Sequence, residues 1–133
     1  MTMRKTQMLR NDFAIAVSLF IWALFLYVRT LAPSLLTADA AEFQTLCYTL
    51  GMTHSSGYPT YIFMGRLFTL IPINNIAYRV NLMSAFFGAL TVGQVCWIIR
   101  LLGGKYLGSV VGALALSLAP LFWQRTIFAE TYA

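Results

Sequence analysis

Hydrophobic residues fall into three long runs along this chain, and polar, turn-rich segments separate the runs. The first run, 13–28, holds no charged residue, and the helix that it predicts continues past Arg29, whose long side chain can reach the membrane surface from a helix end. The other two runs cover 80–99 and 106–123. Because a membrane-spanning helix needs about 20 mainly apolar residues, the pattern predicts three transmembrane helices, over 13–32, 80–99 and 106–123.

The segment between the first two spans, 33–79, is predicted to form an outer loop with two short helices. Over 35–50, apolar side chains recur at helical spacing, and Gly51 ends that helix. Pro59 begins a second apolar run that Pro72 closes, and this run is too short to cross a bilayer, so we expect a surface or re-entrant helix. The expected fold is an all-α integral membrane helical bundle with about three transmembrane helices and two short surface helices.

The first hydrophobic run is also compatible with a cleaved signal peptide, because Ala38-Asp39-Ala40 imitates a small-residue cleavage site. That tripeptide lies far beyond the run and the rest of the chain is equally apolar, so a retained anchor is favoured. The basic residues before the run place the N-terminus in the cytoplasm. We therefore expect a multi-pass protein of the cell membrane, which is the plasma or inner membrane in a bacterium and the endoplasmic reticulum in a eukaryote.

Small residues repeat every four positions in two of the predicted spans. Such a stripe lets a second helix approach closely, so we expect helix contacts along both stripes. The two stripes are Ala85, Ala89 and Gly93 in the second span, and Gly104, Gly108 and Gly112 at the start of the third.

Composition supports a membrane protein, since 59% of the 133 residues are hydrophobic and only 10% are charged. The net charge of +5 is typical of membrane-protein orientation, so the expected partner is the lipid bilayer and no nucleic acid is expected. Cys47 and Cys96 have no motif spacing, which argues against a metal site or a disulfide framework. The last residues, 128–133, carry no helix stop or charged tail, and we expect residues 1–133 to be the N-terminal part of a longer domain.

The polar segment after the first span holds two of the four acidic residues of the chain. Asp39 and Glu42 lie three positions apart and would share one face of a helix. The same spacing is typical of a capping box, in which Asp39 caps the helix and Glu42 reaches back to its backbone N–H, and a capping carboxylate keeps a free oxygen. In the functional interpretation, one carboxylate deprotonates an acceptor hydroxyl while the other orients the acceptor or holds a divalent metal ion, the one cofactor considered.

Three predicted spans place further polar residues on the same outer side. His54, the only histidine, lies in a turn, where it is either a solvated surface residue or a contact to a phosphate. Glu130 either joins the acidic pair or only ends a helix. Arginines on this side either reach to the membrane surface or bind an anionic ligand such as a phosphate. The outer arginines are Arg29, Arg66, Arg79 and Arg125.

The order of these motifs resembles the N-terminal portion of the domain-of-unknown-function family that includes a vertebrate transmembrane protein O-mannosyltransferase, a family similar to the GT-C superfamily of polyprenyl-phosphate-sugar-dependent glycosyltransferases. The resemblance runs from residue 13 to the end of the chain. The motifs that carry it are the basic leader, the first span, Asp39-x-x-Glu42, the turn from His54 to Pro59, Gly65-Arg66-Leu67-Phe68, the run 77–85 and Ala129-Glu130-Thr131-Tyr132.

The resemblance implies a multi-pass enzyme that moves a sugar, with mannose expected, from a polyprenyl-phosphate donor to a hydroxyl of a protein or glycan acceptor on the outer side. It implies that Asp39 is the catalytic base or a metal-linked carboxylate, that Glu42 is its partner, and that His54 contacts the lipid phosphate. Relatives often have consecutive prolines after this histidine, whereas Ser55-Ser56-Gly57 follows it here, which leaves the shape of the turn open. The substrate-binding residues expected beside His54 are Arg66, Arg79 and Glu130.

Two other functions remain open at this point. A transporter or flippase fragment for a lipid-linked or anionic solute is expected to carry charges at mid-membrane, and the predicted spans contain none. A small helical assembly subunit would need only the small-residue stripes.

Overall fold

The computed structural model describes residues 2–34, 39–52 and 57–129, with the side chains of residues 2–9 and 39 outside the description. These residues form helices and no strand, so the predicted all-α fold is confirmed. In chain order the helices are α1 (Thr2–Thr30), α2 (Asp39–Thr49), α3 (Pro59–Thr69), α4 (Ile76–Leu101), α5 (Tyr106–Leu118) and α6 (Pro120–Thr126).

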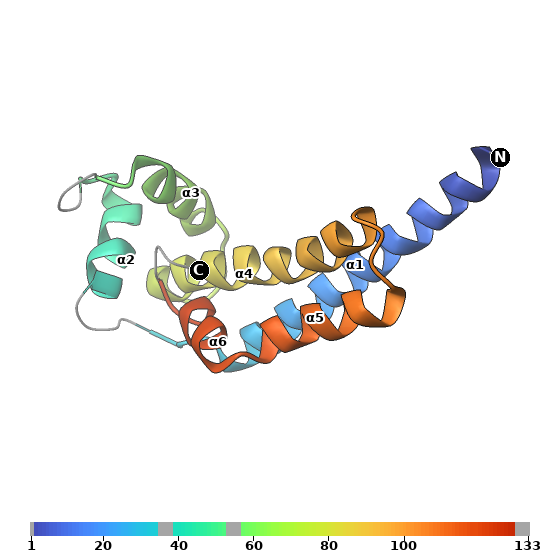
Figure 1. Ribbon diagram of the computed structural model, residues 1–133. Helices are drawn as coiled ribbons and strands as arrows, with labels where there is room; N and C mark the ends of the chain where they lie inside the picture. The colour runs from blue at the N-terminus through green and yellow to red at the C-terminus, as the bar shows by residue number, and fades with distance from the viewer. Residues whose placement is uncertain (1, 35–38, 53–56, 130–133) are drawn as a thin grey trace.

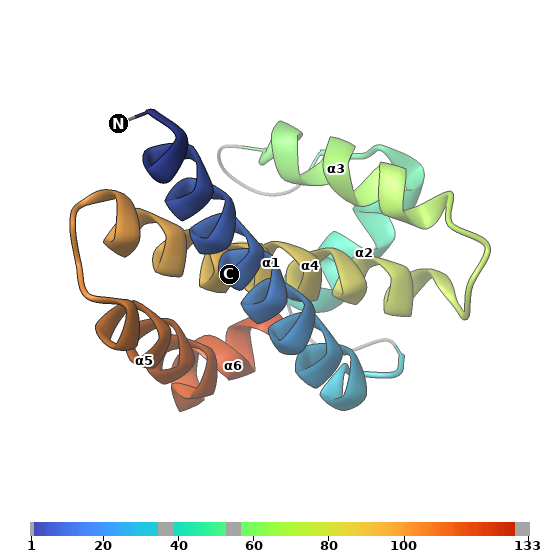
Figure 2. The same cartoon turned by 90° about the vertical axis from the view of Figure 1, so that its right-hand side faces the viewer.

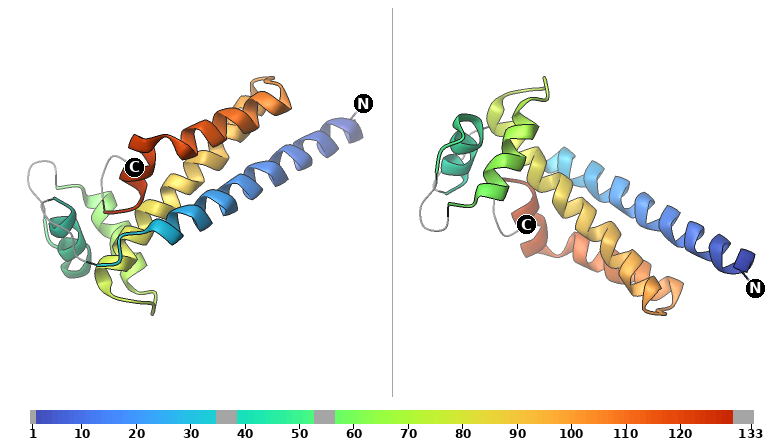
Figure 3. Two further views of the ribbon diagram at one scale, coloured as in Figure 1. Left: turned by 90° about the horizontal axis from the view of Figure 1, so that it is seen from below. Right: turned by 90° about the horizontal axis from the view of Figure 1, so that it is seen from above.

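The helices α1, α4 and α5 run lengthwise beside one another, and the short helices α2, α3 and α6 gather at one end of this bundle (Figure 1). We call that end the loop end, and the opposite end, from which α1 starts, the N-terminal end (Figure 3). The helix α4 lies between the α2–α3 pair and the α5–α6 pair (Figure 2), and it contacts every other helix. Among the described residues, those predicted for the outer side therefore belong to elements that meet around one end of α4.

Two helices are long and apolar enough to cross a membrane, one over Arg10–Thr30 and the other over Ile76–Leu101. The third predicted span is not one helix, because α5 and α6 are bent by 64° at the residue between them. Pro120 explains the bend, since it has no backbone N–H and pushes the preceding Ala119 into an extended conformation, with φ −61° and ψ 124°. By length and composition, the described part of the chain thus has two helices that could span a membrane, or three if the bent pair is one span.

The bend between α5 and α6 leaves carbonyl groups without the helical partners that a continuous helix would supply. Ala119 N–H bonds to Leu116 O at 3.1 Å, and the Tyr27 hydroxyl of α1 donates to Ser117 O at 3.0 Å. The buried tyrosine therefore satisfies a backbone group that the proline has freed, which is how a broken helix is tolerated inside a packed bundle.

The end of α6 is bound to the end of α1. Trp123 Nε1 donates to Thr30 Oγ1 at 3.1 Å, and Ala32 N–H donates to Ile127 O at 3.0 Å. These bonds direct the chain after α6 across the loop end.

The stripe of small residues on α4 forms the predicted close contact. Ala85 and Ala89 are fully buried against α1, and a Cβ atom added to Gly93 would lie 2.8 Å from Ala16 O. A Cβ atom on Gly104 would lie 2.7 Å from Ile99 O, and one on Gly112 would lie 3.3 Å from Ile99 Cδ1, so both glycines closely approach α4. Nothing in the described chain lies within 4 Å of a Cβ atom on Gly108. Among the described residues, the predicted contact along this second stripe is therefore found at Gly104 and Gly112, and not at Gly108. The face of α5 that is buried carries Ser109, Ala113 and Ser117.

The N-terminal end is closed by an ion pair that the sequence analysis did not anticipate. Arg100 Nε lies 2.8 Å from Asp12 Oδ1, and both side chains are largely buried. The same guanidinium donates from Nη1 to Gly104 O at 2.7 Å. One arginine thus joins α1, α4 and the turn that leads into α5.

Candidate functional site

The loop end is built around a buried cluster in which α2, α3, α4 and the segment after α6 meet. Phe43 is its central aromatic residue, with ring centroids 5.6 Å from Tyr58 and 4.9 Å from Tyr61. Gly65 lets α3 approach α2, because a Cβ atom there would collide with the Cys47 side chain. The buried members of the cluster are Ala40, Phe43, Cys47, Ile62, Val80 and Ala129.

Tyr58 precedes α3 and is held in a left-handed conformation with φ 40°. A residue with a side chain rarely adopts this conformation, and it persists only where the surrounding contacts impose it. The contact with Phe43 is one such restraint. The hydroxyl of Tyr61 lies 3.4 Å from Ser84 Oγ, which links α3 to α4. The two tyrosines place phenolic groups beside the helix that carries Glu42.

The predicted catalytic residues lie at the start of α2. Asp39 is the first residue of that helix, and its side chain lies outside the described part of the chain. Glu42 is half-buried, one position before Phe43. His54 and Glu130 also lie outside the described residues. The structure therefore leaves the roles of all four as predictions, and the capping role of Asp39 as well.

The chain neighbours of two predicted acidic residues do come together. Ala40, which follows Asp39, and Ala129, which precedes Glu130, are both buried in the cluster around Phe43. This convergence joins positions 89 residues apart in sequence, 40 and 129.

The sequence did not predict a pair of buried amide side chains at the loop end, those of Gln44 and Asn81. Gln44 Nε2 donates to Asn81 Oδ1 at 2.8 Å, and Ala129 N–H donates to the same oxygen at 2.9 Å. Asn81 Nδ2 donates to Ala32 O at 3.0 Å, just after α1. The only signal in the sequence was an asparagine near the start of an otherwise apolar span.

Arg66, predicted to bind substrate, is half-buried on α3 and bonded to the end of α2. Its Nη1 donates to Tyr48 O at 2.9 Å, and its guanidinium carbon lies 5.3 Å from the centroid of the Tyr48 ring. A cation is favourable there because the last carbonyls of a helix carry partial negative charge.

Arg79, the second predicted arginine, binds the turn between α3 and α4. Its three nitrogens Nε, Nη1 and Nη2 donate to the carbonyl oxygens of Ile73, Thr69 and Asn74 at 2.6, 2.8 and 2.9 Å. Neither Arg79 nor Arg66 contacts a carboxylate among the described residues, so no described side chain offsets the charge of either guanidinium. Both also keep N–H groups beyond those already used, because a guanidinium has five. Their role toward a substrate stays a prediction.

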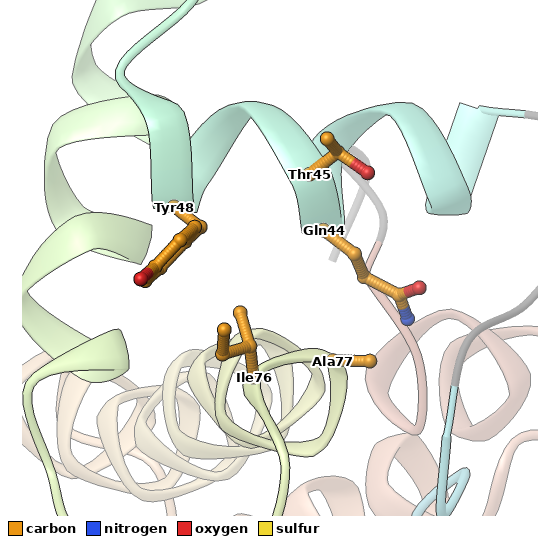
Figure 4. A pocket seen from close by; sticks show the side chains of 5 residues that line it. All are labelled: Gln44, Thr45, Tyr48, Ile76 and Ala77. Carbon is orange, nitrogen blue, oxygen red and sulfur yellow. The ribbon is translucent and has the colours of Figure 1, made fainter.

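A pocket of about 200 Å³ lies between α2 and the start of α4 (Figure 4). Gln44 and Tyr48 point from α2 toward α4 at this place (Figure 4). Neither Glu42 nor either of the two arginines lines the pocket. Its lining residues are Gln44, Thr45, Tyr48, Ile76 and Ala77.

Cys47 lies in α2 at the loop end, and Cys96 lies in α4. Both cysteines are free and buried, and burial raises the pKa of Cys47 to about 12, so this thiol stays protonated at neutral pH. No group of three or more His, Cys, Asp and Glu side chains that could hold a metal ion occurs among the described residues.

Two named relatives match most of this chain. The protein O-mannosyl-transferase TMEM260 of Mus musculus is 33% identical over 119 residues, which make up 89% of this chain and 17% of the mouse protein. The protein of the same name from Dictyostelium discoideum is 27% identical over 127 residues, which are 93% of this chain and 16% of that relative. The chain thus spans less than a fifth of the length of either relative. No solved structure gives a significant match.

The family comparison covers the elements of the loop end. Residues 39–133 match the family described as the protein O-mannosyl-transferase TMEM260 N-terminal domain. The matched region begins at Asp39, the first residue of α2, and includes every helix from α2 to α6. The resemblance inferred from the order of the motifs is confirmed. This chain belongs to the TMEM260 N-terminal domain family of protein O-mannosyl-transferases.

Proposed function

We propose that this chain is the N-terminal part of a multi-pass membrane glycosyltransferase of the GT-C type. The enzyme transfers mannose from a polyprenyl-phosphate donor to a hydroxyl group of a protein. The family match over residues 39–133 carries this proposal, because its relatives are named protein O-mannosyl-transferases. The gathering of α2, α3 and α6 at one end of the apolar helices supports a site at one membrane surface.

In the proposed reaction, Asp39 accepts the proton of the acceptor hydroxyl as that oxygen bonds to C1 of the sugar. The bond between C1 and the phosphate oxygen breaks, and its electron pair leaves with the polyprenyl phosphate. Glu42 orients the acceptor from the next turn of α2. A general base of this kind contributes about 10²–10⁴-fold to the rate.

The phosphate that leaves gains negative charge during transfer, and positive groups at the loop end would stabilise it. Arg66 and Arg79 suit this task because their bonds go to neutral carbonyl groups, which do not cancel their charge. His54 is assigned to the same phosphate, and Glu130 to the binding of the sugar or acceptor. The loop end faces the outer or lumenal side, and the N-terminus lies in the cytoplasm.

Replacing Asp39 by Asn in the full-length protein tests the proposal. Asparagine keeps the size of the side chain but cannot accept the proton, so we expect mannose transfer in isolated membranes to fall by about 100-fold or more. Thr49→Ala, at the exposed end of the same helix, is the matched control and should retain transfer. Unchanged transfer by the Asp39→Asn protein would remove this carboxylate from the mechanism.

A further inference from the structure

Asn81 is a polar side chain buried without any exposed surface near the start of α4, a membrane-spanning helix by length and composition. A buried amide is costly unless its donors and acceptors are bonded. Asn81 meets this condition with three bonds to three different segments of the chain, namely to Gln44 of α2, to the backbone of Ala129 and to the backbone of Ala32.

Two of the three segments bonded to Asn81 adjoin predicted acidic residues. Gln44, itself 2% exposed, follows Glu42 by two positions. Ala129 is the residue before Glu130. A single oxygen, Asn81 Oδ1, accepts from both, so it fixes α2 and the chain after α6 relative to each other.

The two backbone partners of Asn81 lie beyond helix ends. Ala32 follows α1, which ends at Thr30, and Ala129 follows α6, which ends at Thr126. The Ala32 carbonyl and the Ala129 N–H therefore lie outside the backbone hydrogen-bond pattern of α1 and α6. The Asn81 side chain supplies a bond to each of them. Apolar packing alone would not fix these segments as sharply, because it is not directional.

We propose that Asn81 is a positioning residue for sugar transfer: through Gln44 and Ala129 it fixes α2, the helix that carries the predicted acidic residues, relative to the segment after α6. The inference rests on the function proposed above. Asn81 touches no substrate in this role. Its effect arises because a displacement of about 1 Å in a reacting group can cost as much as 100-fold in rate.

Two variants of the full-length protein test the role of Asn81. Asn81→Ala removes all three bonds, whereas Gln44→Leu removes the link to α2 and leaves the bonds to Ala129 and Ala32 in place. For Gln44→Leu we expect kcat per folded molecule to fall about 10-fold to 100-fold, with KM for the polyprenyl-phosphate mannose donor unchanged. Asn81→Ala should lower kcat at least as much. Ser109→Ala is the control, because Ser109 is equally buried but bonds only within α5.

Folded enzyme is counted by size-exclusion chromatography in detergent, so that loss of protein is not taken for loss of activity. If Asn81→Ala does not fold, Gln44→Leu decides alone. An unchanged kcat in Gln44→Leu, or a raised KM at constant kcat, would overturn the positioning role.

The Asp39→Asn background separates failure of this inference from failure of the proposed function. If Asp39 and the amide pair act on one step, adding Gln44→Leu to Asp39→Asn should cause little further loss of kcat. Full activity in Asp39→Asn alone would defeat the proposed function, whatever Gln44→Leu does. A large loss in Asp39→Asn, with normal kcat in Gln44→Leu, would defeat only the positioning role.

Discussion

The two ends of the bundle hold their arginines in opposite ways. At the N-terminal end, Arg100 is paired with the buried carboxylate of Asp12, so the two charges cancel. At the loop end, Arg66 and Arg79 bond to backbone carbonyls and keep their charge. A carbonyl group satisfies N–H donors without neutralising them. The charge thus serves packing at the N-terminal end, whereas the proposed function assigns it to an anionic substrate at the loop end.

Breaking the ion pair at the N-terminal end should produce the largest change. Asp12→Ala leaves Arg100 buried without its carboxylate, and removing one partner of a buried pair typically destabilises by about 3 kcal/mol or more. Unfolding of the purified protein in detergent measures the loss. Transfer per folded molecule should stay normal, because the pair lies at the far end from α2 (Figure 1).

Two controls accompany the Asp12→Ala experiment. Asn11→Ala, at the exposed neighbouring position, should unfold like the parent protein. The double replacement Asp12→Leu with Arg100→Met should recover most of the stability, because an apolar pair of similar size can replace a buried ion pair. If Asp12→Ala lowers kcat per folded molecule, the two ends are not independent and the comparison fails.

Removing a charge at the loop end should have a smaller and different effect. Arg66→Gln should raise KM for the polyprenyl-phosphate donor by about 10-fold, the effect of losing one charge-assisted contact of 1–2 kcal/mol. Arg66→Lys should retain most of the affinity, because the charge remains. Lys105→Gln removes an exposed charge at the N-terminal end and should leave KM unchanged. Equal changes in KM for Arg66→Gln and Lys105→Gln would contradict the proposal that the charge of Arg66 acts on the phosphate of the donor.

The last prediction, with the smallest expected effect on the protein, is on which side of the membrane each end of the bundle lies. Thr49→Cys places a thiol at the loop end, and Lys105→Cys places one at the N-terminal end, both at exposed positions. In intact cells that carry the protein in the plasma or inner membrane, a membrane-impermeant maleimide should label the cysteine at position 49, and label the one at 105 only after permeabilisation. Cys47 and Cys96 themselves should react little below about pH 9, because burial raises the pKa of Cys47 to about 12 and Cys96 is buried too. Labelling of position 105 alone would invert the proposed topology.

The long helices were predictable because uncharged runs of spanning length have one stable form in a bilayer. Pro120 is visible in the sequence, but a hydropathy pattern does not register the backbone N–H that a proline lacks. The third span was therefore predicted as one continuous helix. The small-residue stripe on α4 packs against α1, and Gly104 and Gly112 of the second stripe approach α4, whereas Gly108 has no close neighbour in the described chain. Spacing shows that a helix can approach, and only the fold shows which residues it reaches.

The contacts that organise the candidate site could not be predicted from local sequence. Asn81 and Gln44 are 37 positions apart, and Asp12 and Arg100 are 88 apart, so only the folded chain shows which polar residues meet. The sequence singled out Arg66 and Arg79, but their bonds to carbonyl groups follow from helix ends that the fold brings near, and their role toward a substrate stays a prediction. The acidic residues were identified by their scarcity, their spacing and the family resemblance, and their chemistry awaits the Asp39 experiment.

The break at Pro120 decides where the polypeptide goes after its last long helix. Had α5 continued straight, at a rise of 1.5 Å per residue, the ten residues from 120 to 129 would have extended the rod by about 15 Å. The 64° bend instead directs the chain sideways across the loop end, so that Ala129 lies in the same buried cluster as Phe43. A single proline therefore brings the described segment after α6 back to α2, the helix at which the family match begins.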